Sequence, residues 1–233
     1  APTLPGWGRS SAFPQHLTLS AYASDMAQLL SHCAQTDGPV RRVVFFGGSY
    51  GSVWAMACAA NCPPQPLQKI TVPICGLVVF GGFSPFRDDV QHAQHMTWMN
   101  YLSVGPWYYW FSPLHWLMGR VFRRQVADNV DGELSLLRQI LTGPSAMTPT
   151  ERAELTEWAE KRGSSFEKFE SRMAANMSRS VSRTLEGFDN VPTILNSDWG
   201  FRLSDIRISS GEGSIVILGA KRDHLAPIHM QRY

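Results

Sequence analysis

The stretch Val43-Val44-Phe45-Phe46-Gly47-Gly48-Ser49-Tyr50-Gly51-Ser52 decides the fold. Its first four residues are a short apolar run, typical of a strand that is buried on both faces of a sheet. A glycine-rich turn follows, and residues 52–60 then form an alanine-rich segment with high helix propensity. The order strand, tight turn, helix is typical of an α/β protein with a parallel sheet.

Two further apolar runs predict two more strands of this sheet. Residues 76–80 and 214–218 each consist mainly of valine, leucine, isoleucine or phenylalanine, and each is followed by glycine. An amphipathic pattern over residues 20–33 predicts a helix before the first strand. We therefore predict a short parallel sheet of three strands connected through helices.

The second and third predicted strands are separated by residues 83–213, which is far more than an ordinary crossover needs. The pattern there is helical, and we predict a helical cap inserted after the second strand. The predicted division of the chain is a core part with the turn motif (1–83), a helical cap (84–197) and a second core part (198–233). Helical periodicity is found in residues 88–101, 114–129, 132–141, 150–162 and 166–184.

The motif Gly47-x-Ser49-x-Gly51 fits a nucleophile elbow, a strained turn that exposes a serine hydroxyl above the sheet. Gly48 belongs to the same turn. We expect glycine at 47 and 51 because a Cβ at either position would collide with the neighbouring strand or helix. The backbone N–H of Tyr50, at the start of the following helix, is expected to stabilise a developing oxyanion. The alternative is a glycine-rich turn with an incidental serine, but the strand before it and the helix after it favour the nucleophile.

The third predicted strand leads into Gly219-Ala220-Lys221-Arg222-Asp223. A carboxylate at this position can orient a catalytic imidazole and stabilise its positive charge. Ligands of open α/β sheets bind at the carboxyl ends of the strands, where both Ser49 and Asp223 are predicted to lie. We therefore interpret Asp223 as the acid of a catalytic triad.

A third motif, Pro5-Gly6-Trp7-Gly8-Arg9-Ser10, precedes these two. With all three, nearly the whole chain resembles the α/β-hydrolase superfamily, in particular its cap-bearing serine esterase, lipase and peptidase-like branch. In that family a loop similar to D-x-P-G-x-G-x-S follows the fourth strand, the elbow follows the fifth, and G-x-x-D-x-x-x-P follows the seventh. The resemblance implies a partial α/β-hydrolase core with an inserted cap, and residues 198–206 resemble the return from cap to core.

The resemblance also implies that both ends of the domain are missing from this chain. Strands one to four and the loop with the second oxyanion donor would lie upstream of residue 1. The catalytic histidine would lie further downstream of Asp223 than the chain extends, and we expect His224 and His229 to be surface residues. The strand at residues 43–46 would then lack a neighbour. We therefore expect the chain alone to be catalytically inactive and prone to aggregate.

The function that the resemblance implies is hydrolysis of carboxylic esters, or of N-terminal peptide bonds, through an acyl-enzyme and without a metal or organic cofactor. The alternative is a catalytically inactive truncated product or pseudoenzyme that retains only a binding role. His92-x-x-His95, with Asp88 and Asp89 nearby, has partial metal-ligand spacing. A solvated helix face explains that spacing equally well and is the interpretation we favour.

The charge and hydropathy patterns bear on partners and location. With 21 basic and 19 acidic residues the net charge is +2, which produces no long-range field that would recruit nucleic acid or an anionic membrane. We expect a small apolar ester or peptide-like substrate. No apolar run reaches the roughly 20 residues that cross a bilayer, so we expect no stable membrane insertion and, by default, a soluble cytoplasmic protein.

Aromatic residues are concentrated in the predicted cap, at Trp98, in residues 107–111 and at Trp116. They are expected to form either a lid over an apolar group of the substrate or, for most of them, the cap's own core. A membrane-surface role for residues 107–117 is a further possibility, although that segment itself has no basic face.

Overall fold

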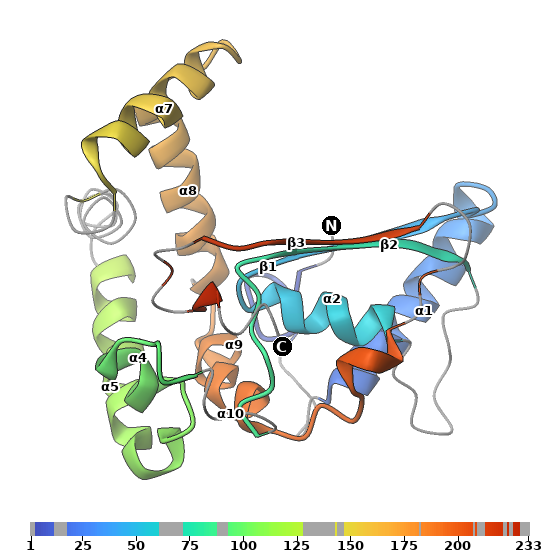
Figure 1. Cartoon of the computed structure of the whole chain (residues 1–233), viewed down its shortest axis with the longest axis horizontal. Coiled ribbons are helices and arrows are strands. Elements are labelled where there is room, and N and C mark those ends of the chain that lie inside the picture. The colour runs from blue at the N-terminus through green and yellow to red at the C-terminus, as the bar shows by residue number, and fades with distance from the viewer. Residues whose placement is uncertain are drawn as a thin grey trace. The chain divides into compact units, whose positions relative to one another are not determined.

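The computed structural model describes residues 3–11, 18–60, 72–87, 93–127, 143, 147–181, 183–206, 208, 213–220, 223 and 226–228. The chain forms two compact units (Figure 1). One unit comprises Ala1–Phe13 with His115–Asp189, and the other comprises Pro14–Leu114 with Asn190–Tyr233. The division at 83/84 and 197/198 predicted from the sequence rests on motifs, and it stays a prediction.

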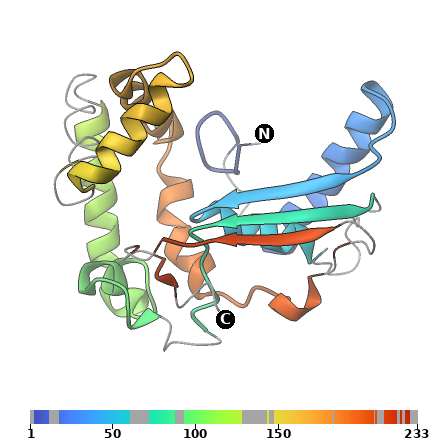
Figure 2. The ribbon, with the colours of Figure 1, turned by 45° about the horizontal axis from the view of Figure 1, so that its top comes forward.

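The second unit contains the predicted parallel sheet of three strands. Strands β1 (Val43–Gly48), β2 (Ile74–Phe80) and β3 (Ser214–Leu218) lie in the order β1-β2-β3. All neighbours are parallel, with Phe46 opposite Val78 and Val78 opposite Val216. Figure 2 shows the three strands side by side. Their carboxyl ends therefore meet at one edge of the sheet.

Two helices cover one face of this sheet. Helix α2 (Gly51–Ala59) packs on β1 and β2, and α1 (Leu19–Thr36) packs on α2. Every residue of α2 from Ser52 to Ala59 is buried. The first turn of α1 is stabilised by the Thr18 hydroxyl, which accepts a hydrogen bond from the Ala21 N–H at 3.1 Å. The sequence placed the start of this helix two residues later, at Ser20.

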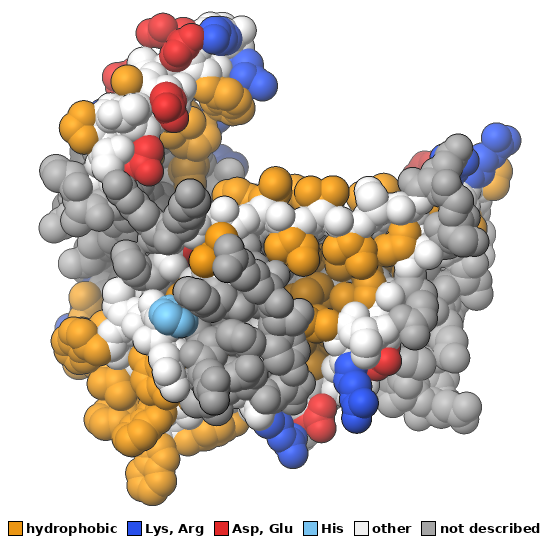
Figure 3. Space-filling view, in the orientation of Figure 1, with side chains coloured by type: hydrophobic (Ala, Val, Ile, Leu, Met, Phe, Trp, Pro, Cys, Tyr) orange, Lys and Arg blue, Asp and Glu red, His pale blue; other side chains and the backbone are white. Residues whose placement is uncertain are grey.

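The other face of the sheet is bare in the described part of the chain. Phe46 is 72% exposed and Val44 60%, whereas Val43, which points toward α2, is 8% exposed. The exposed hydrophobic side chains along this face are visible in Figure 3. The prediction that residues 43–46 are buried on both faces is therefore wrong for this structure, because the described helices that pack on the sheet cover one side only.

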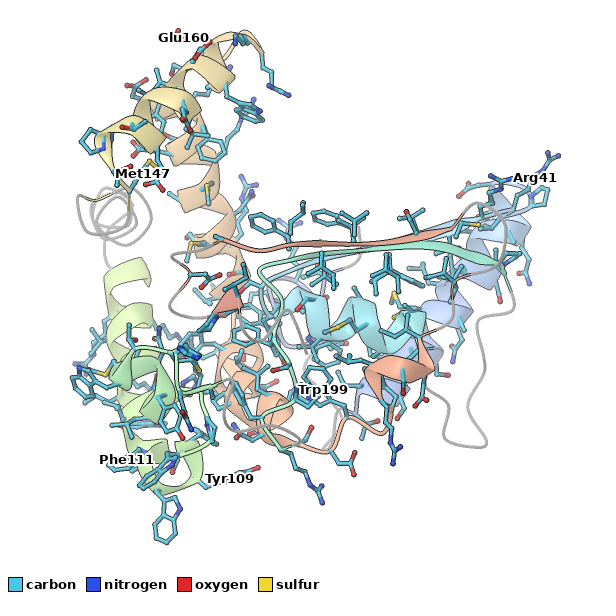
Figure 4. The ribbon with its side chains drawn as sticks, in the orientation of Figure 1. Arg41, Tyr109, Phe111, Met147, Glu160 and Trp199 are labelled. Atoms are coloured by element: carbon cyan, nitrogen blue, oxygen red, sulfur yellow. The ribbon has the colours of Figure 1, made fainter. Side chains whose placement is uncertain are left out.

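The rest of the second unit is mainly helical. It holds α4 (Trp98–Ser103), the first turns of α5 (Tyr108–Ala127), α10 (Val191–Asn196) and a 3₁₀ turn, η2 (Leu203–Asp205). The segment after β2 is tied to α10 by a hydrogen bond from the Phe86 N–H to the Leu195 carbonyl at 3.4 Å. Trp199, labelled in Figure 4, is buried and donates its indole N–H to the Ile194 carbonyl. This hydrogen bond stabilises the turn after α10, from which the chain continues toward β3.

The first unit consists of helices and the N-terminal loop. Its helices are the remainder of α5, α7 (Pro149–Glu160), α8 (Phe166–Val181) and α9 (Glu186–Asp189). These agree with the predicted helical segments 114–129, 150–162 and 166–184, and segment 132–141 lies outside the described residues. A capping box, in which Thr148 and Glu151 bond each other's backbone N–H, stabilises the start of α7.

The Pro5–Ser10 motif packs within this helical unit. The Gly8 N–H donates to the Ser180 carbonyl at 2.7 Å, and the Gly187 N–H donates to the Gly6 carbonyl at 3.0 Å. The Trp7 indole packs against Val181, at the end of α8. A Cβ at Gly187 would overlap the Trp7 ring, so the close approach of α9 to this loop requires glycine there.

Candidate functional site

Ser49 lies in the two-residue turn between β1 and α2, and its backbone is strained. Its φ is +50°, and among the described residues it is the only non-glycine residue with a positive φ. This region costs an ordinary L-residue about 1–2 kcal/mol. The turn is held by a hydrogen bond from the Ser49 N–H to the Phe80 carbonyl at 2.7 Å. The side chain of Ser49 is exposed at the carboxyl end of the sheet, so a strained backbone presents a hydroxyl at this edge.

Gly47 is the glycine that the turn requires for steric reasons. A Cβ at this position would lie 2.5 Å from the Gly51 carbonyl oxygen and 2.7 Å from both the Ser52 Cα and the Ala55 Cβ. The predicted collision is therefore confirmed for Gly47. It is wrong for Gly51, where a Cβ would meet nothing within 4 Å, because this residue begins α2 and faces open space. Gly48 makes only an ordinary contact with Phe80.

Ser52 is a component of the turn that the sequence analysis missed. Its hydroxyl donates to the Ser49 carbonyl at 2.6 Å and accepts from the Phe83 N–H at 3.3 Å. The side chain is fully buried. One hydroxyl thus joins the elbow to the loop after β2. The sequence carries one signal, a single hydroxyl side chain among the apolar residues of α2, but it does not indicate the partners of that hydroxyl.

Tyr50 follows Ser49 directly and is the N-cap residue of α2. Its ring packs edge-on against Trp54, with 5.7 Å between the ring centroids. Burial raises the pKa of the Tyr50 hydroxyl above its ordinary value, so the phenol stays neutral at physiological pH. The side chain is therefore part of the packing beneath the turn. The oxyanion role predicted for the backbone N–H of Tyr50 stays a prediction.

Asp223 lies after β3, partly buried, in a turn that it stabilises itself. Its Oδ1 accepts a hydrogen bond from the Ala226 N–H at 2.8 Å, and its own N–H donates to the Ala220 carbonyl at 3.2 Å. Its Oδ2 faces Gly81, where a Cβ would lie 3.3 Å from that oxygen. Gly81 has a φ of +55°, and its N–H donates to the Leu218 carbonyl at 2.9 Å.

The end of β2 brings the two predicted site residues to the same place. The Phe80 carbonyl accepts the hydrogen bond of Ser49, and the next residue, Gly81, is the position where an added Cβ would lie 3.3 Å from the Asp223 carboxylate. Figure 4 labels Arg41 near the start of β1, at the opposite end of the sheet from this edge. The sheet therefore places a serine hydroxyl and a carboxylate on either side of one dipeptide, Phe80–Gly81.

Other candidates from the sequence fall elsewhere. His224 and His229, and also Asp88 and Asp89, lie outside the described residues, as does His92. His95 is exposed in the loop before α4. Among the helices that the structure describes, none is both long enough and apolar enough to cross a bilayer.

Comparison with known protein families identifies the family of this chain. The family model described as "Alpha/beta hydrolase family" matches residues 1–233, which is the full length of the sequence. No curated protein and no solved structure matched the chain.

Proposed function

Since the chain belongs to the α/β-hydrolase family, whose members are generally hydrolytic enzymes, we propose that it carries the nucleophile and the acid of a serine hydrolase that acts on carboxylic esters. N-terminal peptide bonds are the second substrate class. The observation that supports this proposal most is the positive φ of Ser49 between a strand and a helix. Such strain persists where the surrounding structure enforces it, and it concentrates at functional sites.

In the proposed reaction the Ser49 hydroxyl attacks the carbonyl carbon of the ester and gives its proton to an imidazole. The tetrahedral oxyanion is stabilised by the Tyr50 N–H, at the N-terminus of α2, where the partial positive charge of the helix adds to the hydrogen bond. The imidazole then protonates the departing alcohol, leaving an acyl group on Ser49. Water releases the acid by the same steps in reverse order.

Asp223 has the orienting role in this proposal. Its carboxylate would accept a hydrogen bond from the imidazole and stabilise the imidazolium that forms during each proton transfer. The turn hydrogen bonds at Ala226 and Ala220 fix the Asp223 backbone and one carboxylate oxygen. The imidazole itself is proposed to come from a histidine outside this chain.

The test compares the 233-residue chain with the product of the complete reading frame that contains it, using hydrolysis of p-nitrophenyl acetate. We expect saturable hydrolysis by the complete product, abolished by Ser49→Ala and reduced by about four orders of magnitude by Asp223→Asn, with circular dichroism unchanged. The 233-residue chain is expected to be inactive. Hydrolysis by that chain, lost in Ser49→Ala, would instead make His224 or His229 the base.

Two other outcomes would contradict the proposal. A complete product that folds but hydrolyses neither esters nor N-terminal peptide bonds would favour the inactive, binding-only alternative. Normal hydrolysis in the Ser49→Ala variant would mean that the nucleophile is another residue, and that the strain at Ser49 has a structural cause.

A further inference from the structure

Ser52, in the first turn of α2, carries a hydroxyl that packing alone does not require. The residue is 0% exposed, and the buried side chains that follow it in the helix, from Val53 to Ala59, are all hydrophobic. Alanine would favour the helix more than serine does and would bring no polar group into the core. The reason for a hydroxyl at this position must therefore lie in its hydrogen bonds.

These two hydrogen bonds have defined directions. A carbonyl oxygen only accepts and a backbone N–H only donates, so the hydroxyl donates to the Ser49 carbonyl at 2.6 Å and accepts from the Phe83 N–H at 3.3 Å. The backbone N–H of Ser52 donates to the same Ser49 carbonyl at 2.9 Å. One residue thus supplies two donors to the carbonyl of the proposed nucleophile.

Gly82 leaves the space that the Ser52 hydroxyl occupies. A Cβ at this glycine would lie 3.3 Å from the Ser52 Oγ and would overlap a methyl group of Val79. The next residue, Phe83, provides the N–H that the hydroxyl accepts. The loop after β2 therefore approaches Ser52 closely and holds its hydroxyl in place.

The peptide groups on both sides of the Ser49 Cα are held by hydrogen bonds. The angles φ and ψ of Ser49 describe the rotation of these two groups about the Cα. The preceding group is held by the bond from the Ser49 N–H to the Phe80 carbonyl at 2.7 Å, and the following group by the Ser52 hydroxyl. With both groups fixed, Ser49 keeps its φ of +50° in spite of the strain.

The peptide group after Ser49 also contains the proposed oxyanion donor, the Tyr50 N–H. A peptide group is planar and almost always trans, so the Ser49 carbonyl and the Tyr50 N–H lie in one plane and point in opposite directions. A hydrogen bond that fixes the carbonyl therefore also fixes the direction of the N–H. It polarises the N–H as well, because hydrogen bonds in series strengthen one another.

We propose that Ser52 is a positioning residue, whose hydroxyl fixes the Ser49–Tyr50 peptide group and so maintains the strained φ of Ser49 and directs the Tyr50 N–H. Because Ser52 is buried, it acts through this peptide group and does not touch the substrate. The catalytic consequence rests on the proposed function, whereas the conformational consequence does not.

The first experiment measures hydrolysis of p-nitrophenyl acetate by the product of the complete reading frame, well below the melting temperature of every variant. Removing an oxyanion donor outright lowers kcat by about 10²–10³. In Ser52→Ala the donor remains but is less well directed, so we expect kcat to fall about tenfold. KM should stay within about twofold, because the oxyanion forms only in the transition state.

Two further variants separate positioning from packing. Ser52→Thr keeps a hydroxyl that can bond a carbonyl three residues earlier in a helix, and it should restore kcat to within about threefold. Ser84→Ala is the matched control. It removes a serine hydroxyl that is equally buried and lies next to Phe83, but that has no hydrogen-bond partner among the described residues. We expect this control to leave kcat unchanged.

The second experiment needs no activity and uses the 233-residue chain. Ser49→Gly is expected to raise the melting temperature, because glycine adopts a positive φ without strain. If the Ser52 hydroxyl enforces that φ, the rise should disappear in the Ser52→Ala background, where the turn can relax, and should persist in the Ser84→Ala background. An equal rise in all three backgrounds would overturn the proposal.

The two experiments distinguish failure of this proposal from failure of the proposed function. A complete product that does not hydrolyse the ester would contradict the proposed function, and the melting temperatures would then decide the role of Ser52. In an active product, an unchanged kcat in Ser52→Ala or an equal loss in Ser84→Ala would overturn the positioning role. So would a Ser52→Thr variant that folds but is no more active than Ser52→Ala.

Discussion

Replacing Gly47 by alanine tests the packing of the elbow most directly. The added Cβ would meet three atoms at 2.5–2.7 Å, whereas non-bonded carbon atoms prefer about 3.5–4.0 Å. Two of the three atoms, the Gly51 oxygen and the Ser52 Cα, belong to the backbone of the turn and of α2. No side-chain rotation relieves this clash. Overpacking typically costs about 1–3 kcal/mol, and because backbone must move we expect a loss of about 3 kcal/mol in the free energy of unfolding.

The assay is urea unfolding of the full chain followed by tryptophan fluorescence, with Gly51→Ala as the control. A Cβ at Gly51 has open space, and alanine favours the helix over glycine, so the control should be unchanged or stabilised by about 0.5–1 kcal/mol. Equal destabilisation by both variants would refute the reasoning. It would mean that glycine at these positions is needed for backbone freedom rather than for space.

Three further predictions follow from burial, strain and titration. Leu77→Ala, at a side chain 1% exposed beneath α2, should lower the free energy of unfolding by about 2–5 kcal/mol. Val216→Ala, on the bare face of the sheet, should lower it by less than about 1 kcal/mol. Equal urea midpoints for the two variants would contradict this prediction. Ser49→Gly should relieve the strain of the positive φ and raise the melting temperature. The free energy of unfolding should rise by about 0.5–1 kcal/mol, after the larger backbone entropy of glycine in the unfolded chain is subtracted. Ser49→Ala should bring no such gain, and a destabilised glycine variant would show that the turn is unstrained. Burial lowers the pKa of His115, whose Nε2 contacts the Phe188 carbonyl. Around the ordinary pKa of histidine the native state therefore binds fewer protons than the unfolded chain. The free energy of unfolding should have its full value above about pH 6.5 and should fall as the pH decreases below that value. In His115→Gln the dependence of the melting temperature on pH from 7 to 5 should be flatter, and an unchanged slope would assign it to other groups.

The sequence predicted the elements of the site because its signals are local. A run of apolar residues, a tight glycine turn and a helix-forming segment within ten residues define β1, the turn and α2 without reference to distant parts of the chain. Likewise, the position of Asp223 after an apolar run was enough to place it at the carboxyl end of a strand. Parallel pairing then brings both residues to one edge.

The details of the site could not be predicted in the same way. Whether a Cβ collides at Gly47 or at Gly51 depends on the exit angle of α2, which the sequence motif leaves open. The link from Ser52 to Phe83 joins residues from two different strand–loop connections. Neither feature has a sequence period, so no pattern search would find it.

By itself, the sequence determined the parallel three-stranded core, the strained serine turn and the family, because each depends on short-range preferences or ordered motifs. Only the tertiary structure decided which surfaces are covered. The bare face of the sheet and the exposed rings from Trp98 to Phe111 are apolar in sequence, as core residues are. The sequence pattern at these positions is the same whether or not another element covers them. Burial depends on which elements pack together, and the hydrophobicity of the residues alone does not specify this packing.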